Sequence, residues 1–168
     1  DVTVNAAGMS SDQLEDISDA ISKVDTINNL SLTNGELDVE IGNLLSKSVD
    51  AAVDAGSMTA GQITQVADNI SGVASDGISN LTLTTAQDAD EIIALLGINT
   101  STDSVSVIAT GMSVAKLNAV AAEIDEVSSI SGVVSVTSDL AAANLTTLAG
   151  QLTYAAGVDE LSVNASGM

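Results

Sequence analysis

The side chains of this chain that could do chemistry are almost all carboxylates. Clusters of oxygen ligands suit Ca²⁺, which takes about six to eight of them, so a calcium site is one expectation. No EF-hand loop or glycine-rich calcium nonapeptide occurs, and solvated helix faces are the favoured account of the same residues. The sequence therefore leaves Ca²⁺ open as a ligand and assigns no metal-binding residue. The clustered carboxylates are Asp12, Glu15, Asp16, Asp19, Asp88, Asp90, Glu91, Asp139, Asp159 and Glu160.

Catalytic groups of other kinds are scarce. The chain has no His and no Cys, so the usual pairs of base and nucleophile cannot form. No phosphate-binding loop or nucleophile elbow occurs either. Two carboxylates could hydrolyse a glycosidic bond, but no pair and no sugar cleft is marked in the sequence. We therefore expect that the protein is not an enzyme and that it carries no resident organic cofactor.

Short runs in which apolar and hydroxyl residues alternate offer the other candidate site. Such runs predict strands with one apolar and one polar face. The polar face could bind a glycan, ice or a partner protein, although the β-branched shape of Thr and the need for solubility explain the same residues. The possible strand-face contacts are Thr3, Ser31, Thr33, Thr82, Thr84, Ser135 and Thr137.

Four methionines mark the repeat that positions these residues. Each follows a pair of small residues, and a valine lies five positions before it. After the first three methionines, apolar residues recur in steps of three, four and three, which predicts one buried face of a long helix. The methionines are Met9, Met58, Met112 and Met168. The apolar quartets are Leu14, Ile17, Ile21, Val24; Ile63, Val66, Ile70, Val73; and Leu117, Val120, Ile124, Val127.

Capping residues predict where the long helices begin. Ser10 with Gln13 and Thr59 with Gln62 fit a capping box, whereas Ser113 has Lys116 at the third position and loses half of the box. A glycine just before the cap would supply a backbone bend that a Cβ resists. This glycine is Gly8, Gly111 or Gly167 in three units. The second unit has Ser57 instead, which argues against a strict positive φ there.

A shorter unit alternates with the long one. Strands are predicted at residues 30–33, 81–84 and 134–137, and each precedes a short helix. The double repeat is therefore strand, long helix, strand, short helix. We expect a single solenoid array over residues 1–168. Its double repeats would span residues 1–48, 49–102 and 103–157, with a partial repeat at 158–168.

Alternating strands and helices normally make a parallel sheet with right-handed crossovers. Because every unit keeps one pattern, the sequence favours an α/β right-handed repeat solenoid resembling a leucine-rich-repeat horseshoe. It would have one parallel sheet of seven strands, with the helices on the other side. A compact doubly wound sheet is the alternative, but it would place successive helices in different environments.

Charge and hydropathy limit the partners. Lys and Arg number 3 against 23 Asp and Glu, which gives a formal net charge of −20. This field repels phosphate backbones, so no nucleic acid is expected as a partner. No apolar run approaches the roughly 20 residues of a membrane span, so no membrane insertion is expected. The acidic excess is typical of marine, halophilic or secreted bacterial surfaces and predicts a secreted or cell-surface location.

Two units of the sequence resemble a known style of repeat. They are Val-x-Val-x-Ala-x-Gly-Met-Ser-x-x-Gln-Leu at residues 2–14 and Leu-Thr-Leu-Thr-Thr-Ala-Gln at residues 81–87. Both are similar to the strand–helix tandem repeats of very large secreted bacterial adhesins and surface-layer-like proteins. The resemblance implies an extracellular stalk, coat or fibre segment with possible calcium dependence, and it assigns no binding residue. The alternative function is a recognition module that binds glycan, ice or a partner protein through the Ser/Thr-rich strand face.

The terminal strands predict association. The runs at residues 2–4 and 161–163 have no obvious polar cap. Open strand edges template further pairing. We therefore expect the chain to associate with itself or with neighbouring repeats of a longer parent.

Overall fold

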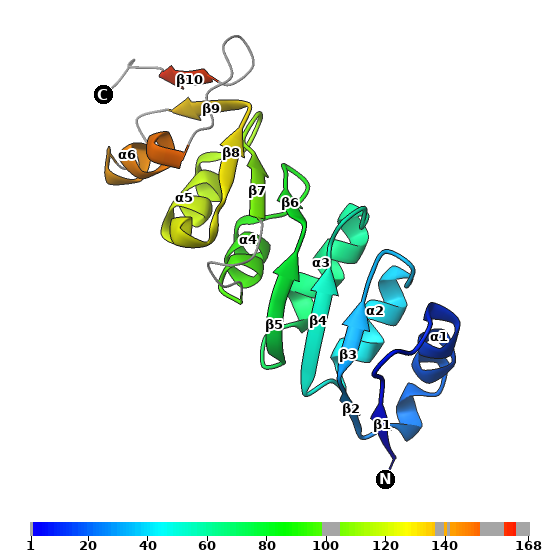
Figure 1. Cartoon of the computed structure of the whole chain (residues 1–168). Helices are drawn as coiled ribbons and strands as arrows, with labels where there is room; N and C mark the ends of the chain where they lie inside the picture. Colours follow the sequence, from blue (N-terminus) through cyan, green and yellow to red (C-terminus); the bar gives the residue numbers. More distant parts are fainter. Residues whose placement is uncertain (1, 99–104, 137–139, 141, 152–159, 164–168) are drawn as a thin grey trace. The chain divides into compact units, whose positions relative to one another are not determined.

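The computed structural model describes residues 2–98, 105–136, 140, 142–151 and 160–163. These residues form a mixed α/β structure with parallel strand pairs and six α-helices, and no closed barrel occurs among them (Figure 1). The chain divides into two compact units, residues 1–79 (unit 1) and residues 80–168 (unit 2). In the portion of the chain that the structure describes, no helix is long and apolar enough to cross a bilayer.

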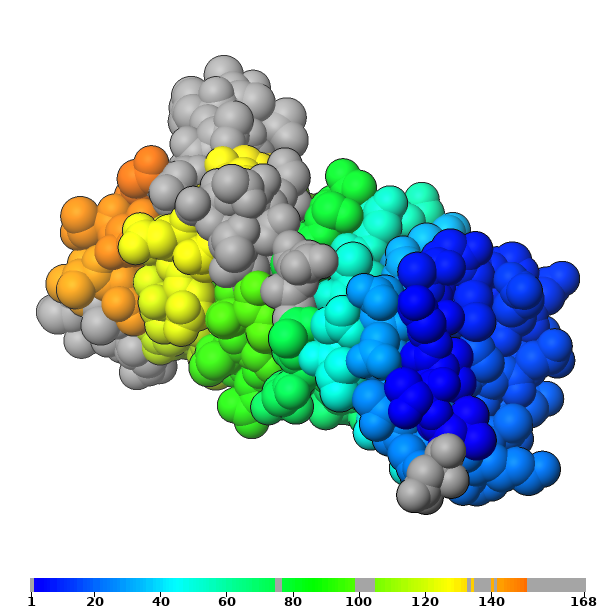
Figure 2. All heavy atoms as spheres, turned by 60° about the horizontal axis from the view of Figure 1, so that its bottom comes forward, coloured from blue at the N-terminus to red at the C-terminus, as the bar shows by residue number. Residues whose placement is uncertain are grey.

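Unit 1 contains two parallel sheets and three α-helices. Its strands are β1 (Thr3–Asn5), β2 (Thr26–Asn28), β3 (Leu30–Leu32), β4 (Asp50–Asp54) and β5 (Ala74–Ser79). Its helices are α1 (Ser11–Asp19), α2 (Asp38–Leu45) and α3 (Ala60–Asn69). Strand β1 pairs with β2, while β3, β4 and β5 pair in that order. Helix α2 contacts both α1 and α3. Figure 2 shows that the first strand and the turn after it, in dark blue, lie at the surface.

Unit 2 repeats this plan. Its strands are β6 (Leu81–Leu83), β7 (Val105–Ile108), β8 (Ser129–Ser131), β9 (Val133–Val136) and β10 (Glu160–Val163). Its helices are α4 (Ala89–Leu96), α5 (Val114–Ala122) and α6 (Ala142–Gln151). Strands β6, β7 and β8 form one parallel sheet, and β9 pairs with β10 in another. Helix α5 contacts both α4 and α6.

The strands differ from the prediction in number and in continuity. All seven predicted strands are present, but β2, β5 and β8 were not predicted. The expectation of one seven-stranded sheet is wrong, because the described residues form ten strands in four sheets. Each added strand is followed directly by a residue with positive φ, which is 54° at Asn29, 56° at Asn80 and 80° at Gly132. At Asn29 the chain bends between β2, which pairs with β1, and β3, which pairs with β4. At Gly132 it bends between β8, which pairs with β7, and β9, which pairs with β10.

Three equivalent turns connect the long strands to the long helices. In each, the N–H of a methionine donates to the carbonyl oxygen of an alanine three residues earlier, at 3.0–3.1 Å. These pairs are Met9 with Ala6, Met58 with Ala55, and Met112 with Ala109. The residue before each methionine has positive φ, 70° at Gly8, 68° at Ser57 and 80° at Gly111, as a type II turn requires. The expectation that Ser57 avoids this conformation is wrong; Gly167 lies outside the described residues.

Replacing Ser57 by glycine is expected to raise the free energy of unfolding by about 0.5–1 kcal/mol. A Cβ at left-handed φ costs roughly 1–2 kcal/mol, which exceeds the backbone entropy that glycine loses on folding. Gly8→Ser, the reverse change in the first turn, should destabilise by a similar amount, since a Cβ there meets nothing within 4 Å. Urea unfolding measures both variants. A Ser57→Gly protein no more stable than the parent would contradict the strain at this turn.

Helix starts follow the prediction closely. The capping boxes of Ser10 with Gln13 and of Thr59 with Gln62 are confirmed. In the second box the Gln62 N–H donates to the Thr59 hydroxyl at 3.2 Å, and the Thr59 N–H donates to Gln62 Oε1 at 2.7 Å. Ser113 accepts from the Lys116 N–H at 3.4 Å, and Lys116 has no oxygen to return the second bond. The predicted loss of half of the third box is therefore confirmed.

Helix ends do not follow the prediction. Helices α1 and α5 stop before the third quartet residue and continue as 3-10 turns, Ile21–Lys23 and Ile124–Glu126. Helix α3 stops at Asn69, three residues before Gly72, whose φ is 93°. In α1 and α5 the last two quartet residues therefore lie beyond the α-helix, whereas Ile70 caps α3 with helical φ and ψ and only Val73 lies past its end. Eight of the twelve quartet residues are buried, and the half-buried ones are Ile17, Ile21, Val73 and Ile124.

Candidate functional site

The short strands expose their hydroxyl face as the alternation predicts. In β3, Ser31 is exposed between Leu30 and Leu32, which are 1% and 0% exposed. In β6, Thr82 is exposed between two equally buried leucines, and Thr3 is exposed in β1. These three hydroxyls make no hydrogen bond within the described residues. Of the other predicted contacts, Thr137 and the side chain of Ser135 lie outside the part of the chain that is described.

Thr33 and Thr84, which follow these strands, have structural partners. The Thr33 hydroxyl accepts from the Gly35 N–H at 3.1 Å and donates to Glu36 Oε2 at 3.3 Å. The Thr84 hydroxyl accepts from the Ala86 N–H at 3.1 Å and lies 3.4 Å from Gln87 Oε1. Both threonines therefore build the loops before α2 and α4. Among the predicted contacts of unit 1, the two hydroxyls without a partner, those of Thr3 and Ser31, lie on different sheets.

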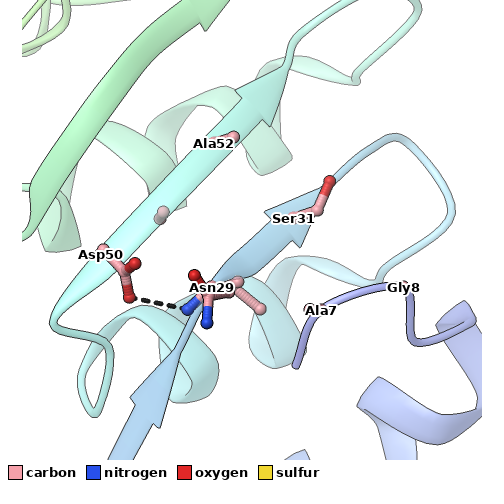
Figure 3. Close-up of a pocket in the computed structure, with 8 residues that line it drawn as sticks. Ala7, Gly8, Asn29, Ser31, Asp50 and Ala52 are labelled. Atoms are coloured by element: carbon pink, nitrogen blue, oxygen red, sulfur yellow. Dashed lines mark hydrogen bonds between the residues drawn. The ribbon is translucent and has the colours of Figure 1, made fainter. Parts of the chain in front are cut away.

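A polar hollow of about 250 Å³ opens in unit 1. Its lining residues are Ala7, Gly8, Asn29, Leu30, Ser31, Asp50, Ala51 and Ala52. It forms where the chain turns from β2, which pairs with β1, into β3, which pairs with β4, and Figure 3 shows Asn29 beside Asp50 at this point. Asp50 Oδ1 accepts from the Asn29 N–H at 2.7 Å, and Asn29 Nδ2 donates to Asn5 Oδ1 at 3.1 Å. The hollow could hydrogen-bond a small polar group. The sequence does not reveal this hollow, because no local pattern marks Asn29 as a bend.

The carboxylate clusters do not converge on an ion. Asp12, Glu15, Asp16 and Asp19 are all exposed on or near α1. Asp88 instead caps α4, accepting from the Glu91 N–H at 2.9 Å. Among the described residues, no group of three or more possible metal-ligating side chains comes together. Asp139, Asp159 and the side chain of Glu160 lie outside those residues, and Asp90 is exposed.

Calcium chloride is expected to raise the melting temperature mainly by screening the repulsion among the 23 carboxylates. Sodium chloride at matched ionic strength should therefore recover most of the effect. Thermal melts in the two salts, followed by circular dichroism, measure the difference. A rise of many degrees with micromolar Ca²⁺ that sodium does not reproduce would show that specific sites exist.

The most completely bonded polar cluster links three segments of unit 1. Glu36 is only 2% exposed, and its carboxylate accepts from the Ser11 hydroxyl at 2.8 Å and from the Thr33 N–H at 2.7 Å. Gln62, at the start of α3, donates from Nε2 to the carbonyl oxygens of Asn34 at 3.2 Å and of Glu36 at 2.5 Å. The loop at residues 33–36 is therefore held by α1 on one side and by α3 on the other.

Unit 2 contains the same link with different residues. Gln87 takes the place of Glu36, is 1% exposed, and accepts from the Thr84 N–H at 3.0 Å. Lys116, at the start of α5, donates from Nζ to the carbonyl oxygen of Thr85 at 2.5 Å. Thr85 corresponds to Asn34 in the repeat, so Lys116 replaces the bond that Gln62 makes. A side chain at the third position of a long helix thus fastens the loop of the preceding repeat in both units.

No protein-family model, curated protein or solved structure matches the chain.

Proposed function

We propose that this chain is an extracellular structural repeat segment, serving as a stalk, coat or fibre building block of a bacterial cell-surface protein. The observation that supports this role is the recurring link between neighbouring repeats. Gln62 makes it in unit 1 and Lys116 makes it in unit 2, each from a long helix to the loop before it. Contacts that recur in this way fix one repeat on the next, which is what a spacer requires.

The proposed arrangement is a right-handed α/β solenoid resembling a leucine-rich-repeat horseshoe, built from the double repeats at residues 1–48, 49–102 and 103–157. Equivalent backbone bonds support it. The N–H of Ala6, Ala55 and Ala109 donates to the carbonyl oxygen of Asn28, Ser79 and Ser131 respectively, at 2.8–2.9 Å. Every strand pair in the described parts of the chain is parallel, and helices next to one another along each unit are in contact. Equivalent contacts therefore recur in each of the three double repeats.

The charge of the chain supports a location outside the cell. A formal charge of −20 makes neighbouring copies repel each other at low salt, while ions at marine or extracellular strength screen that repulsion within about 10 Å. A surface layer or stalk would then remain hydrated and still pack against its neighbours. We propose that its partners are further copies or neighbouring repeats of a longer parent.

Duplication of the chain tests the structural role. Two copies joined head to tail should have about twice the maximum dimension of one copy, as measured by small-angle X-ray scattering, because stacked repeats add length linearly. Two separately folded compact copies would instead scatter as two bodies, with two peaks in the distribution of interatomic distances, whereas one continuous stack gives a single skewed distribution. The compact result would contradict the solenoid and the spacer function together.

Surface labelling tests the location. Antibodies raised against the chain should stain intact cells of the native source without permeabilisation. Staining that appears only after permeabilisation would contradict the extracellular role while leaving the solenoid untouched. Sedimentation of the purified chain at low and high salt measures self-association, which should increase with salt as the repulsion is screened.

A further inference from the structure

We infer that the loop at residues 33–36 is a self-modifying site, at which Asn34 converts to aspartate and isoaspartate with the help of Thr33 and Glu36. This inference goes beyond the structural role proposed above. It concerns a chemical change in the loop that links α1 to α3.

The two reacting residues are placed for this chemistry. Asn34 is exposed, and its side-chain amide makes no hydrogen bond within the described residues. Gly35 follows directly, so no Cβ hinders the approach of its backbone nitrogen to the neighbouring amide carbon. Asn is among the thermally labile residues, and its lability arises from this attack by the next residue. The sequence Asn34-Gly35 offers the least hindered form of it.

Hydrogen bonds around Gly35 form a path for its proton. The Gly35 N–H donates to Thr33 Oγ1 at 3.1 Å, and Thr33 Oγ1 donates to Glu36 Oε2 at 3.3 Å. The Ser11 hydroxyl holds the other oxygen of Glu36 at 2.8 Å, and the side chain is only 2% exposed. A buried, oriented carboxylate can thus take up a proton that passes through the hydroxyl. Thr33 contacts the reacting N–H, while Glu36 acts through Thr33.

The reaction balances with water as the only co-reactant. The Gly35 nitrogen gives its proton through Thr33 to Glu36 and forms a bond to Cγ of Asn34. The bond from Cγ to Nδ2 then breaks: Nδ2 keeps its two hydrogens, takes up the one proton held by Glu36, and leaves as ammonia. Water opens the cyclic imide at one of its two carbonyl carbons, which yields aspartate or isoaspartate. The net change replaces the Asn34 amide by a carboxylate.

The product would alter the link to α3. Isoaspartate routes the backbone through the side chain and adds one atom to the chain between the Cα atoms of residues 34 and 35. The carbonyl oxygen that Gln62 Nε2 holds at 3.2 Å belongs to Asn34 and would move with this change. The added negative charge would also lie on a protein that is already strongly acidic. Modification should therefore loosen the repeat to which this loop belongs.

Unit 2 provides an internal control. Its equivalent loop is Thr84-Thr85-Ala86-Gln87, in which the Thr84 hydroxyl accepts from the Ala86 N–H at 3.1 Å. The hydrogen bonds are the same, but the loop has neither a side-chain amide at the second position nor a carboxylate at the fourth. It should remain unmodified under conditions that modify residue 34.

The test is a time course on the full chain at fixed pH, followed by digestion and mass spectrometry of the peptide that spans residue 34. Fragmentation distinguishes isoaspartate from aspartate and from changes at other asparagines. Glu36→Gln should slow conversion at least about tenfold, because general-base assistance typically contributes about 10²–10⁴-fold. Gln87 shows that glutamine fits this position, so the variant should fold. Thr33→Ser should retain the parent rate, whereas Thr33→Val should lose it.

Three outcomes would overturn the inference. One is no conversion at residue 34. Another is equal rates in the parent and in Glu36→Gln, which would remove the carboxylate from the reaction. The third is faster conversion in Glu36→Gln, since this would mean that the loop's rigidity protects Asn34. The melting temperature of each variant shows whether the substitution has weakened the structure. A loosened loop would raise the rate of conversion at residue 34, whereas loss of the base would lower it.

Discussion

Replacing Ile70 by alanine is expected to lower the free energy of unfolding by about 2–5 kcal/mol. Ile70 is 0% exposed, and it follows the last residue of α3, where its N–H donates to the carbonyl oxygen of Val66 at 2.9 Å. Truncation removes buried methyl groups and leaves a cavity that the close-packed neighbours fill only in part. Urea unfolding followed by circular dichroism measures the loss.

Ile21 is the matched control for this substitution. Both residues belong to unit 1, and Ile21 is the third quartet residue after Met9, as Ile70 is after Met58. Ile21 is only half-buried, at the start of a 3-10 turn. Ile21→Ala should therefore cost clearly less than Ile70→Ala, because less apolar area returns to water. Equal losses in the two variants would contradict the burial that the structure assigns to Ile70. Ile124 is half-buried as well, so Ile124→Ala should also fall below Ile70→Ala.

Gln62→Glu is expected to destabilise unit 1 by about 2–4 kcal/mol, although the two side chains have the same shape. Gln62 is buried, and its Nε2 donates to two carbonyl oxygens of the loop at residues 33–36. A glutamate would retain the bond to the Thr59 N–H, but it would place a charged oxygen against those carbonyl oxygens. The substitution thus breaks the link between repeats while keeping the helix cap. Urea unfolding again gives the change.

Gln13→Glu provides the control for charge and capping. Gln13 occupies the same third position in α1, where it is exposed and completes a capping box with Ser10. A glutamate there still accepts from the cap and interacts favourably with the helix N-terminus, so the change should stay within about 0.5 kcal/mol. If Gln13→Glu and Gln62→Glu had the same effect, the bonds of Gln62 to the loop would not contribute to stability.

The strands and helix starts could be predicted because their causes are local. Alternation at Leu30-Ser31-Leu32 and hydroxyl caps such as Thr59 are written in a few adjacent residues, and the structure confirms both. The additional strands β2 and β8 are three residues long, Thr-Ile-Asn and Ser-Ile-Ser, and each has a single apolar residue, so no alternation marks them. They form because a neighbouring strand supplies the ladder, and that partner is distant in sequence.

The candidate site was predictable only in part for the same reason. Exposure of Ser31 and Thr82 follows from alternation, but the role of Lys116 depends on a carbonyl oxygen 31 residues away. One local pattern does indicate the bonded loops before α2 and α4. Thr33 and Thr84 are each followed three residues later by Glu36 or Gln87, the spacing in which a side-chain oxygen reaches back to an earlier N–H. Here the spacing occurs in a loop and not at a helix start.

The bend at Asn29 bears on how unit 1 carries load. Strands β2 and β3 are one continuous stretch of chain, which pairs with β1 before the bend and with β4 after it. A pull that separates the two sheets therefore acts on covalent backbone, as well as on the few backbone hydrogen bonds by which Ile27 is joined to Lys47 and Val49. Gly132 joins β8 to β9 in the same way in unit 2. Strands of three or four residues can thus resist tension that their hydrogen bonds alone would not withstand.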